Sequence, residues 1–131
     1  MRTLVFVVVG TASMILAAHA AAPSDALVVE MREFAFRPAF LRVPIGRPVT
    51  LRFVNRGQIA HQFETTALQG LALTVSDEQL RLEGVSVEIL RLQPGASAAV
   101  VFTPRRKGRF PFACTIEGHR EAGMVGVLEA Y

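Results

Sequence analysis

Short runs of alternating apolar and polar residues fill this sequence from residue 27 onward, and they constrain its fold more than any other feature. The clearest run covers residues 49–54, where apolar side chains recur at every second position, as in a half-buried strand. Turn formers such as Asn55-Arg56-Gly57 and Pro94-Gly95 separate the runs. Many short strands with turns between them are typical of a β-sandwich or barrel, and no segment has the pattern of a βαβ unit.

The positions of these runs predict an all-β domain of seven to eight strands. We expect strands at 27–32 (continued by 33–36), 40–43, 49–54, 60–65, 85–89, 98–103, 110–114 and 125–130. Between them, Ser76-Asp77-Glu78-Gln79 has the form of a capping box, and Gly84 is suited to end a helix. We therefore expect a short helix or helical turn inside an excursion near 66–84.

The first twenty residues have the features of a signal peptide that is removed on export. Arg2 supplies a positive charge, an interrupted apolar stretch follows, and Ala18-His19-Ala20 fits the small-x-small pattern of a signal-peptidase site. The apolar stretch is shorter than the roughly 20 residues of a membrane span, although an uncleaved anchor is the alternative. We expect residues 1–20 to be a cleaved signal peptide and residues 21–131 to form one periplasmic domain that is not an integral membrane protein.

Composition excludes one class of function and isolates a small set of side chains. The formal net charge is +3, which is too mild to suggest nucleic-acid binding. The sequence has one cysteine, and cleavage after Ala20 would leave His61 and His119 as the histidines. A lone cysteine in an exported chain cannot form an intramolecular disulfide. It is therefore a free thiol, an intermolecular partner or a metal ligand.

The segment from Cys114 to Met124 places three metal-binding side chains on one expected loop. Its pattern is Cys114-x4-His119-x4-Met124, and the two glycines within it permit sharp turns that would curl the loop around one point. His61, on a separate expected strand, supplies a second imidazole. Two imidazoles, a thiolate and a weak axial thioether form the donor set of blue-copper electron-transfer sites.

Other interpretations of these residues remain open. Zinc binds two imidazoles and a thiolate, but a catalytic zinc site keeps an open position, which Met124 would occupy here. Taken singly, Cys114 and Met124 could be core residues, His61 a hydrogen-bonded strand residue and His119 an exposed loop residue. The combination favours copper, because it uses every histidine and cysteine of the expected mature chain in the required order.

These residues and their surroundings resemble the cupredoxin family of blue-copper proteins, which includes plastocyanin and azurin. The Cys-x4-His-x4-Met loop is similar to the ligand loops of auracyanin and rusticyanin, and the residues around Phe34 and His61 are similar to the first half of the family pattern. The resemblance covers most of residues 27–131. It implies a cupredoxin-like Greek-key β-sandwich or barrel that holds one type 1 copper ion, with His61, Cys114, His119 and Met124 as its metal ligands.

The resemblance also implies a function. It implies single-electron transfer by a monomer that is not itself an enzyme, with a redox protein such as a cytochrome, an oxidase or a reductase as partner. A catalytic role is not indicated, because the expected site has neither an open coordination position nor an acid–base pair. The alternative function is a periplasmic copper-binding carrier or homeostasis protein that uses the same site.

Two features depart from the family pattern or add to it. Gln62 follows His61 where many family members have asparagine or serine, residues that tie this strand to the ligand loop, and Thr115 stands where the partner of that tie would be expected. The basic turn Arg105-Arg106-Lys107, with Arg109 nearby, could steer an acidic partner or could be an ordinary solvated turn.

Overall fold

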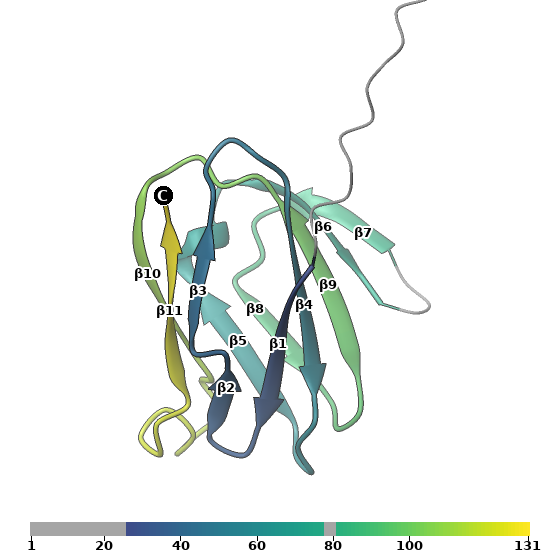
Figure 1. Cartoon of the computed structure of the whole chain (residues 1–131). Coiled ribbons are helices and arrows are strands. Elements are labelled where there is room, and N and C mark those ends of the chain that lie inside the picture. Colours follow the sequence, from purple (N-terminus) through teal and green to yellow (C-terminus); the bar gives the residue numbers. More distant parts are fainter. Residues whose placement is uncertain (1–25, 78–80) are drawn as a thin grey trace, which may run out of the picture.

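The computed structural model of the chain describes residues 26–77 and 81–131. Within these residues, eleven strands form two β-sheets that pack face to face, and one 3₁₀ turn lies between two of the strands along the chain (Figure 1). The expected signal peptide, residues 1–20, lies outside the described residues. In the described part of the chain, no helix is long and apolar enough to cross a membrane.

Strands cross repeatedly between the two sheets along the chain, so many neighbours within a sheet are distant in sequence. The first sheet has the order β2-β1-β4-β9-β6-β7, and the second has the order β3-β11-β10-β5-β8. Two pairs, β1 with β4 and β3 with β11, are parallel, and the other described pairs are antiparallel. This arrangement confirms the expected all-β sandwich. The bounds are β1 Leu27–Arg32, β2 Ala35–Arg37, β3 Phe40–Val43, β4 Val49–Asn55, β5 His61–Thr65, η1 Thr66–Leu68, β6 Ala72–Ser76, β7 Arg81–Val85, β8 Ile89–Leu92, β9 Ser97–Phe102, β10 Gly108–Ala113 and β11 Val125–Ala130.

The core between the sheets is built from the inward-facing residues of the alternating runs. In β4, Leu51 and Phe53 are buried and Arg52 between them is exposed, which is the alternation that the sequence predicts. The ring of Phe63 lies 4.5 Å from that of Phe53 and 5.0 Å from that of Phe112, measured between centroids. Phe63 and Phe112 belong to β5 and β10, so this close-packed aromatic layer holds those two strands in a defined relative position.

The expected continuation of the first strand through 33–36 is wrong. The chain turns back at Glu33 and Phe34, so that β2 pairs antiparallel with β1 and Arg32 lies opposite Ala35. Phe34 has a φ of 60°, in the left-handed region that a bulky residue rarely adopts. The alternation of apolar and polar residues in the sequence does not reveal this turn, because neither Glu33 nor Phe34 is a usual turn former.

The helix expected at the capping box is also wrong. β6 and β7 form an antiparallel hairpin in this part of the chain, and β6 also pairs with β9. Pairing with neighbouring strands therefore outweighs the local helix signal. Residues 78–80, within the capping box and the segment after it, lie outside the described residues. The helical turn of the 66–84 excursion is the 3₁₀ turn η1 at its beginning.

The described residues contain eleven strands rather than seven or eight, because two expected runs are divided and β6 lies in the excursion where no strand is expected. The expected strand at 85–89 is interrupted at Ser86, whose φ of 71° does not belong to an extended strand. β7 therefore ends at Val85 in the first sheet, and β8 begins at Ile89 in the second.

Candidate metal site

The candidate ligands lie at one end of the sandwich (Figure 1). His61 is the first residue of β5, while Cys114, His119 and Met124 lie on the loop that joins β10 to β11. Because β10 lies between β5 and β11 in the second sheet, this loop begins beside the strand that carries His61. Strand pairing thus brings together residues that are more than fifty positions apart in sequence.

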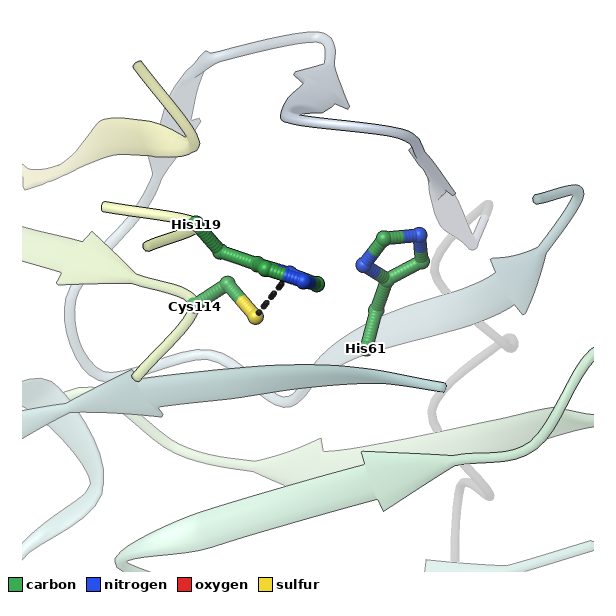
Figure 2. Close-up of side chains that lie close together, drawn as sticks. All are labelled: His61, Cys114 and His119. Carbon is green, nitrogen blue, oxygen red and sulfur yellow. Dashed lines mark hydrogen bonds between the residues drawn. The ribbon is translucent and has the colours of Figure 1, made fainter. Parts of the chain in front are cut away.

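Figure 2 shows the side chains of His61, Cys114 and His119 directed toward one another. One donor atom from each residue lies within 4.8 Å of the others, and Cys114 Sγ is 3.3 Å from His119 Nδ1. Ligand atoms about 2.0–2.3 Å from one metal ion are separated from each other by roughly 3–4 Å, so this spacing is near that of a shared ion. His61 and Cys114 are fully buried, and His119 is 6% exposed.

Met124 ends the loop and is fully buried. Its carbonyl accepts a hydrogen bond from the N–H of Cys114 (3.0 Å), and its own N–H donates to the carbonyl of His119 (3.0 Å). These two bonds fasten the ends of the loop together before β11 begins. Gly118 and Gly123 have φ values of 79° and 101°, so the sharp turns expected at both glycines are present.

Further hydrogen bonds connect the loop to β5. The N–H of Gln62 donates to Cys114 Sγ at 3.3 Å, which stabilises negative charge on the sulfur. The hydroxyl of Thr115 donates to Oε1 of Gln62 at 3.0 Å. Gln62 therefore makes the strand-to-loop tie despite its greater length, and Thr115 is its partner, as the resemblance predicts.

Replacing Thr115 with valine is expected to weaken this tie while preserving the shape of the side chain. The free energy of unfolding of the metal-free protein should fall by about 1 kcal/mol, the usual net contribution of one hydrogen bond. Denaturant unfolding followed by circular dichroism measures this change. Thr50→Val, on the partly exposed face of β4, is the matched control. Equal effects of the two substitutions would contradict a specific role for the Thr115 hydroxyl.

Asn55 positions the segment that leads into His61. Its Nδ2 donates to the carbonyls of Ile59 (2.8 Å) and Leu92 (3.0 Å), and its Oδ1 accepts a hydrogen bond from the N–H of Gly57 (2.9 Å). The side chain is 1% exposed, so these bonds satisfy a buried amide. Asn55 thus shapes the β4–β5 connection, although its position in the sequence predicts only a turn.

The ring of His61 is the strongest sign that the cluster accepts a ligand. Both ring nitrogens are buried, and neither makes a hydrogen bond to any residue of the described chain. Buried polar atoms in native proteins are nearly always paired, so two unpaired nitrogens on one ring indicate a missing partner. Burial lowers the pKa of His61, the neighbouring His119 lowers it further, and Glu33 opposes both effects. The imidazole is therefore neutral near pH 7 and has a lone pair for a metal ion.

The chemistry of the donor set selects the metal. Two imidazoles and a thiolate with a nearby thioether are the ligands of type 1 copper, since sulfur donors suit the reduced ion and imidazole suits both oxidation states. The residues present therefore fit a single copper ion. His61, Cys114 and His119 form the core of this donor set.

The structure separates the basic turn from this cluster. Arg105-Arg106-Lys107 precedes β10, whereas Cys114 follows the opposite end of the same strand, so the turn lies at the far end of the sandwich (Figure 1). Arg106 stacks over Phe110, with its guanidinium carbon 5.3 Å from the ring centroid. The turn does not border His119, and a partner held there would not contact the cluster.

Sequence reasoning missed two residues of the β1–β2 turn that contact the histidines. The ring of Phe34 packs edge-on against the imidazole of His119, with centroids 5.2 Å apart. A carboxylate oxygen of Glu33 lies 3.9 Å from Nε2 of His61. The unusual pair Glu33-Phe34 between two short apolar runs is the only sequence signal that could have indicated these two contacts. The sequence around the pair has the pattern of one continuous strand, which conceals the turn.

The fold and the cluster together define a cupredoxin. The cupredoxin-like domain family matches residues 4–127, and the chain belongs to this family. It is 35% identical over 105 residues to the copper-resistant cuproprotein CopI of Rubrivivax gelatinosus, an alignment covering 76% of this chain. The chain spans only 61% of that relative's length.

Solved structures share the fold at low sequence identity. Auracyanin from Roseiflexus castenholzii superposes with a TM-score of 0.59 at 20% identity, covering 84% of this chain and 99% of auracyanin. The multicopper oxidase of Pediococcus acidilactici superposes with a TM-score of 0.69 at 14% identity, covering 91% of this chain but 29% of the oxidase. The fold therefore occurs both as a small protein and as one part of larger enzymes.

Proposed function

We propose that this protein binds one type 1 copper ion through His61, Cys114, His119 and Met124 and transfers single electrons between redox partners. The observation that carries the proposal is the buried His61–Cys114–His119 cluster, in which donor atoms lie within 4.8 Å of one another and the His61 nitrogens are unpaired among the described residues. Copper bound by such a donor set supplies a one-electron redox couple. Met124 would supply the fourth, weakly bound donor through its thioether sulfur.

The protein's own residues would make this electron transfer rapid by holding the donors in place. Backbone bonds between Cys114, His119 and Met124 close the ligand loop, and the Thr115–Gln62 bond ties it to β5. A site that is shaped in advance changes little when its charge changes, so little reorganisation opposes the transfer. Slight exposure of His119, at 6%, places one ligand near the surface where a partner protein could approach.

We propose that the protein is an electron carrier rather than an enzyme. The three clustered residues are buried, and Met124 beside them is also fully buried, so a substrate has no direct path to the metal position. We further propose that the chain is exported to the periplasm, loses residues 1–20 and acts as a monomer of residues 21–131. Mass spectrometry of the exported protein tests the cleavage after Ala20.

Titration of the metal-free protein with copper(II) tests metal binding directly. The expected result is one copper per chain and an intense visible absorption that saturates at that ratio. Stopped-flow mixing of the loaded protein with periplasmic c-type cytochromes then tests electron transfer. A colourless complex would contradict the blue-copper assignment, and a blue protein that exchanges electrons with no partner would favour the second function below.

A second candidate function is copper handling, and one observation favours it. The relative with 35% identity is described as a copper-resistant cuproprotein, and it is matched over 76% of this chain. In this role the same four residues would retain copper in the periplasm. Growth on copper distinguishes the functions, because deletion of a copper-handling protein lowers tolerance, whereas deletion of an electron carrier impairs growth without added copper.

Replacing Met124 with leucine is expected to keep copper bound and raise the reduction potential. Leucine fills similar buried space but offers no sulfur, so the oxidised ion loses a weak donor. The preference for copper(II) over copper(I) should fall about tenfold, which corresponds to about 59 mV for a one-electron couple. Voltammetry measures the shift. Complete loss of copper would contradict a weak axial role.

A further inference from the structure

We propose that Glu33 is a positioning residue for the metal site: its carboxylate, 3.9 Å from Nε2 of His61, closes on the ring to accept a hydrogen bond from Nε2–H and so directs the other ring nitrogen to the copper. This inference rests on the proposed copper binding. Figure 2 shows one ring nitrogen of His61 on the side of Cys114 and His119 and the other on the opposite side. A histidine that binds metal through one nitrogen commonly donates its other N–H to a carboxylate or carbonyl, which fixes the ring.

The carboxylate of Glu33 is held beside the ring by the backbone. Its Oε1 accepts a hydrogen bond from the N–H of Gln58 at 2.5 Å and lies 3.9 Å from Nε2 of His61. An approach of about 1 Å would turn this contact into a hydrogen bond. Although the side chain of Glu33 is 42% exposed, the Gln58 bond keeps its oxygen over the ring edge instead of leaving it free in solvent.

Gly57 provides the space in which the carboxylate and the imidazole meet. A Cβ at this position would lie 2.5 Å from Oε1 of Glu33 and 2.8 Å from Nε2 of His61. The backbone of Gly57 does not have a positive φ, so its conformation does not demand glycine. The missing side chain is needed instead for the approach of Glu33 to His61, because a Cβ would occupy the space between the carboxylate and the imidazole.

The turn that carries Glu33 is built at a conformational cost. Phe34 has a φ of 60°, where glycine or asparagine is usual, and its ring packs against His119. Unusual backbone conformations persist where the surrounding structure enforces them, and they are common at functional sites. The two residues of this turn thus contact both imidazoles of the cluster, Glu33 at His61 and Phe34 at His119.

An anion that accepts a hydrogen bond from a ligand imidazole strengthens that ligand and stabilises the more positive metal ion. Glu33→Ala should therefore weaken copper(II) binding relative to copper(I) by about tenfold, a rise in potential of about 59 mV. Glu33→Gln keeps an acceptor oxygen without the charge, so its potential should lie between those of the native protein and Glu33→Ala. Gly57→Ala, which displaces the carboxylate but keeps its charge, should also raise the potential.

The experiment compares these variants with Glu30→Gln, which removes a carboxylate three residues away that forms ion pairs with Arg32 and Arg56. Voltammetry gives the potentials. In the metal-free protein, ¹⁵N chemical shifts of the His61 ring should show the proton on Nε2 in the native chain and a shift toward the other tautomer in Glu33→Ala. Potentials and tautomers that change no more than in Glu30→Gln would overturn the inference. Absence of the intense visible band in the native protein would instead overturn the proposed copper site.

Discussion

Replacing Cys114 with serine is expected to abolish the intense visible absorption that the native protein gives with copper(II). The band requires electron donation from a thiolate, and Cys114 is the one cysteine in the sequence. Serine keeps the size of the side chain and can still accept the hydrogen bond from Gln62, so the loop retains its connections. His61 and His119 remain, and the variant should bind copper(II) weakly and without colour.

Absorption spectra and copper titrations of the native and Cys114→Ser proteins, recorded side by side, measure this effect. Circular dichroism of both metal-free proteins checks that the fold is intact. Met124→Leu is the matched comparison, since it also removes a sulfur from the loop but should leave the protein blue. A Cys114→Ser protein that retains the native band would show that another group supplies the colour.

Replacing Gly126 with alanine is expected to destabilise the protein by about 2–3 kcal/mol, the cost of overpacking a tight interior. Gly126 lies opposite Phe112 in the β10–β11 pair. A Cβ there would overlap the ring of Phe112 and lie 2.5 Å from the carbonyl oxygen of Ala39. Phe112 cannot move aside easily, because it is 1% exposed and packs against Phe63 and Phe36.

Chemical denaturation of the metal-free protein measures the change in the free energy of unfolding. Gly84→Ala is the control, because a Cβ at Gly84 would have no neighbour within 4 Å and the residue does not have a positive φ. The control should change stability by less than about 0.5 kcal/mol. If Gly126→Ala were as stable as Gly84→Ala, the close packing of β11 on Phe112 would not exist in solution.

Local patterns in the sequence predicted most strands correctly, because alternation reports directly which residues face the core. The expected strands at 27–32, 40–43 and 125–130 match β1, β3 and β11. The errors occur where pairing partners override local signals. Ser76, the first residue of the capping box, ends β6, which pairs with β7 and β9, and the apolar residues around Phe34 conceal a turn that only the pairing of β1 with β2 reveals.

The sequence by itself predicts the donor set of the proposed copper site and its chemistry. Three of its members share one loop, so their spacing can be recognised from the sequence alone. The types of these ligands and their order favour a soft metal such as copper. The alternation of apolar and polar residues, which predicts an all-β fold, can also be recognised from the sequence alone. These properties depend on residues close to one another in the chain.

Only the tertiary structure decided how distant segments meet. It brought His61 to Cys114 across the β5–β10 pair, joined Gln62 to Thr115, and placed Glu33 at the edge of the His61 ring. It also placed the basic turn at the end of the sandwich opposite the His61–Cys114–His119 cluster. Such contacts depend on strand register and on packing between sheets, and a one-residue change of register would turn each side chain to the opposite face.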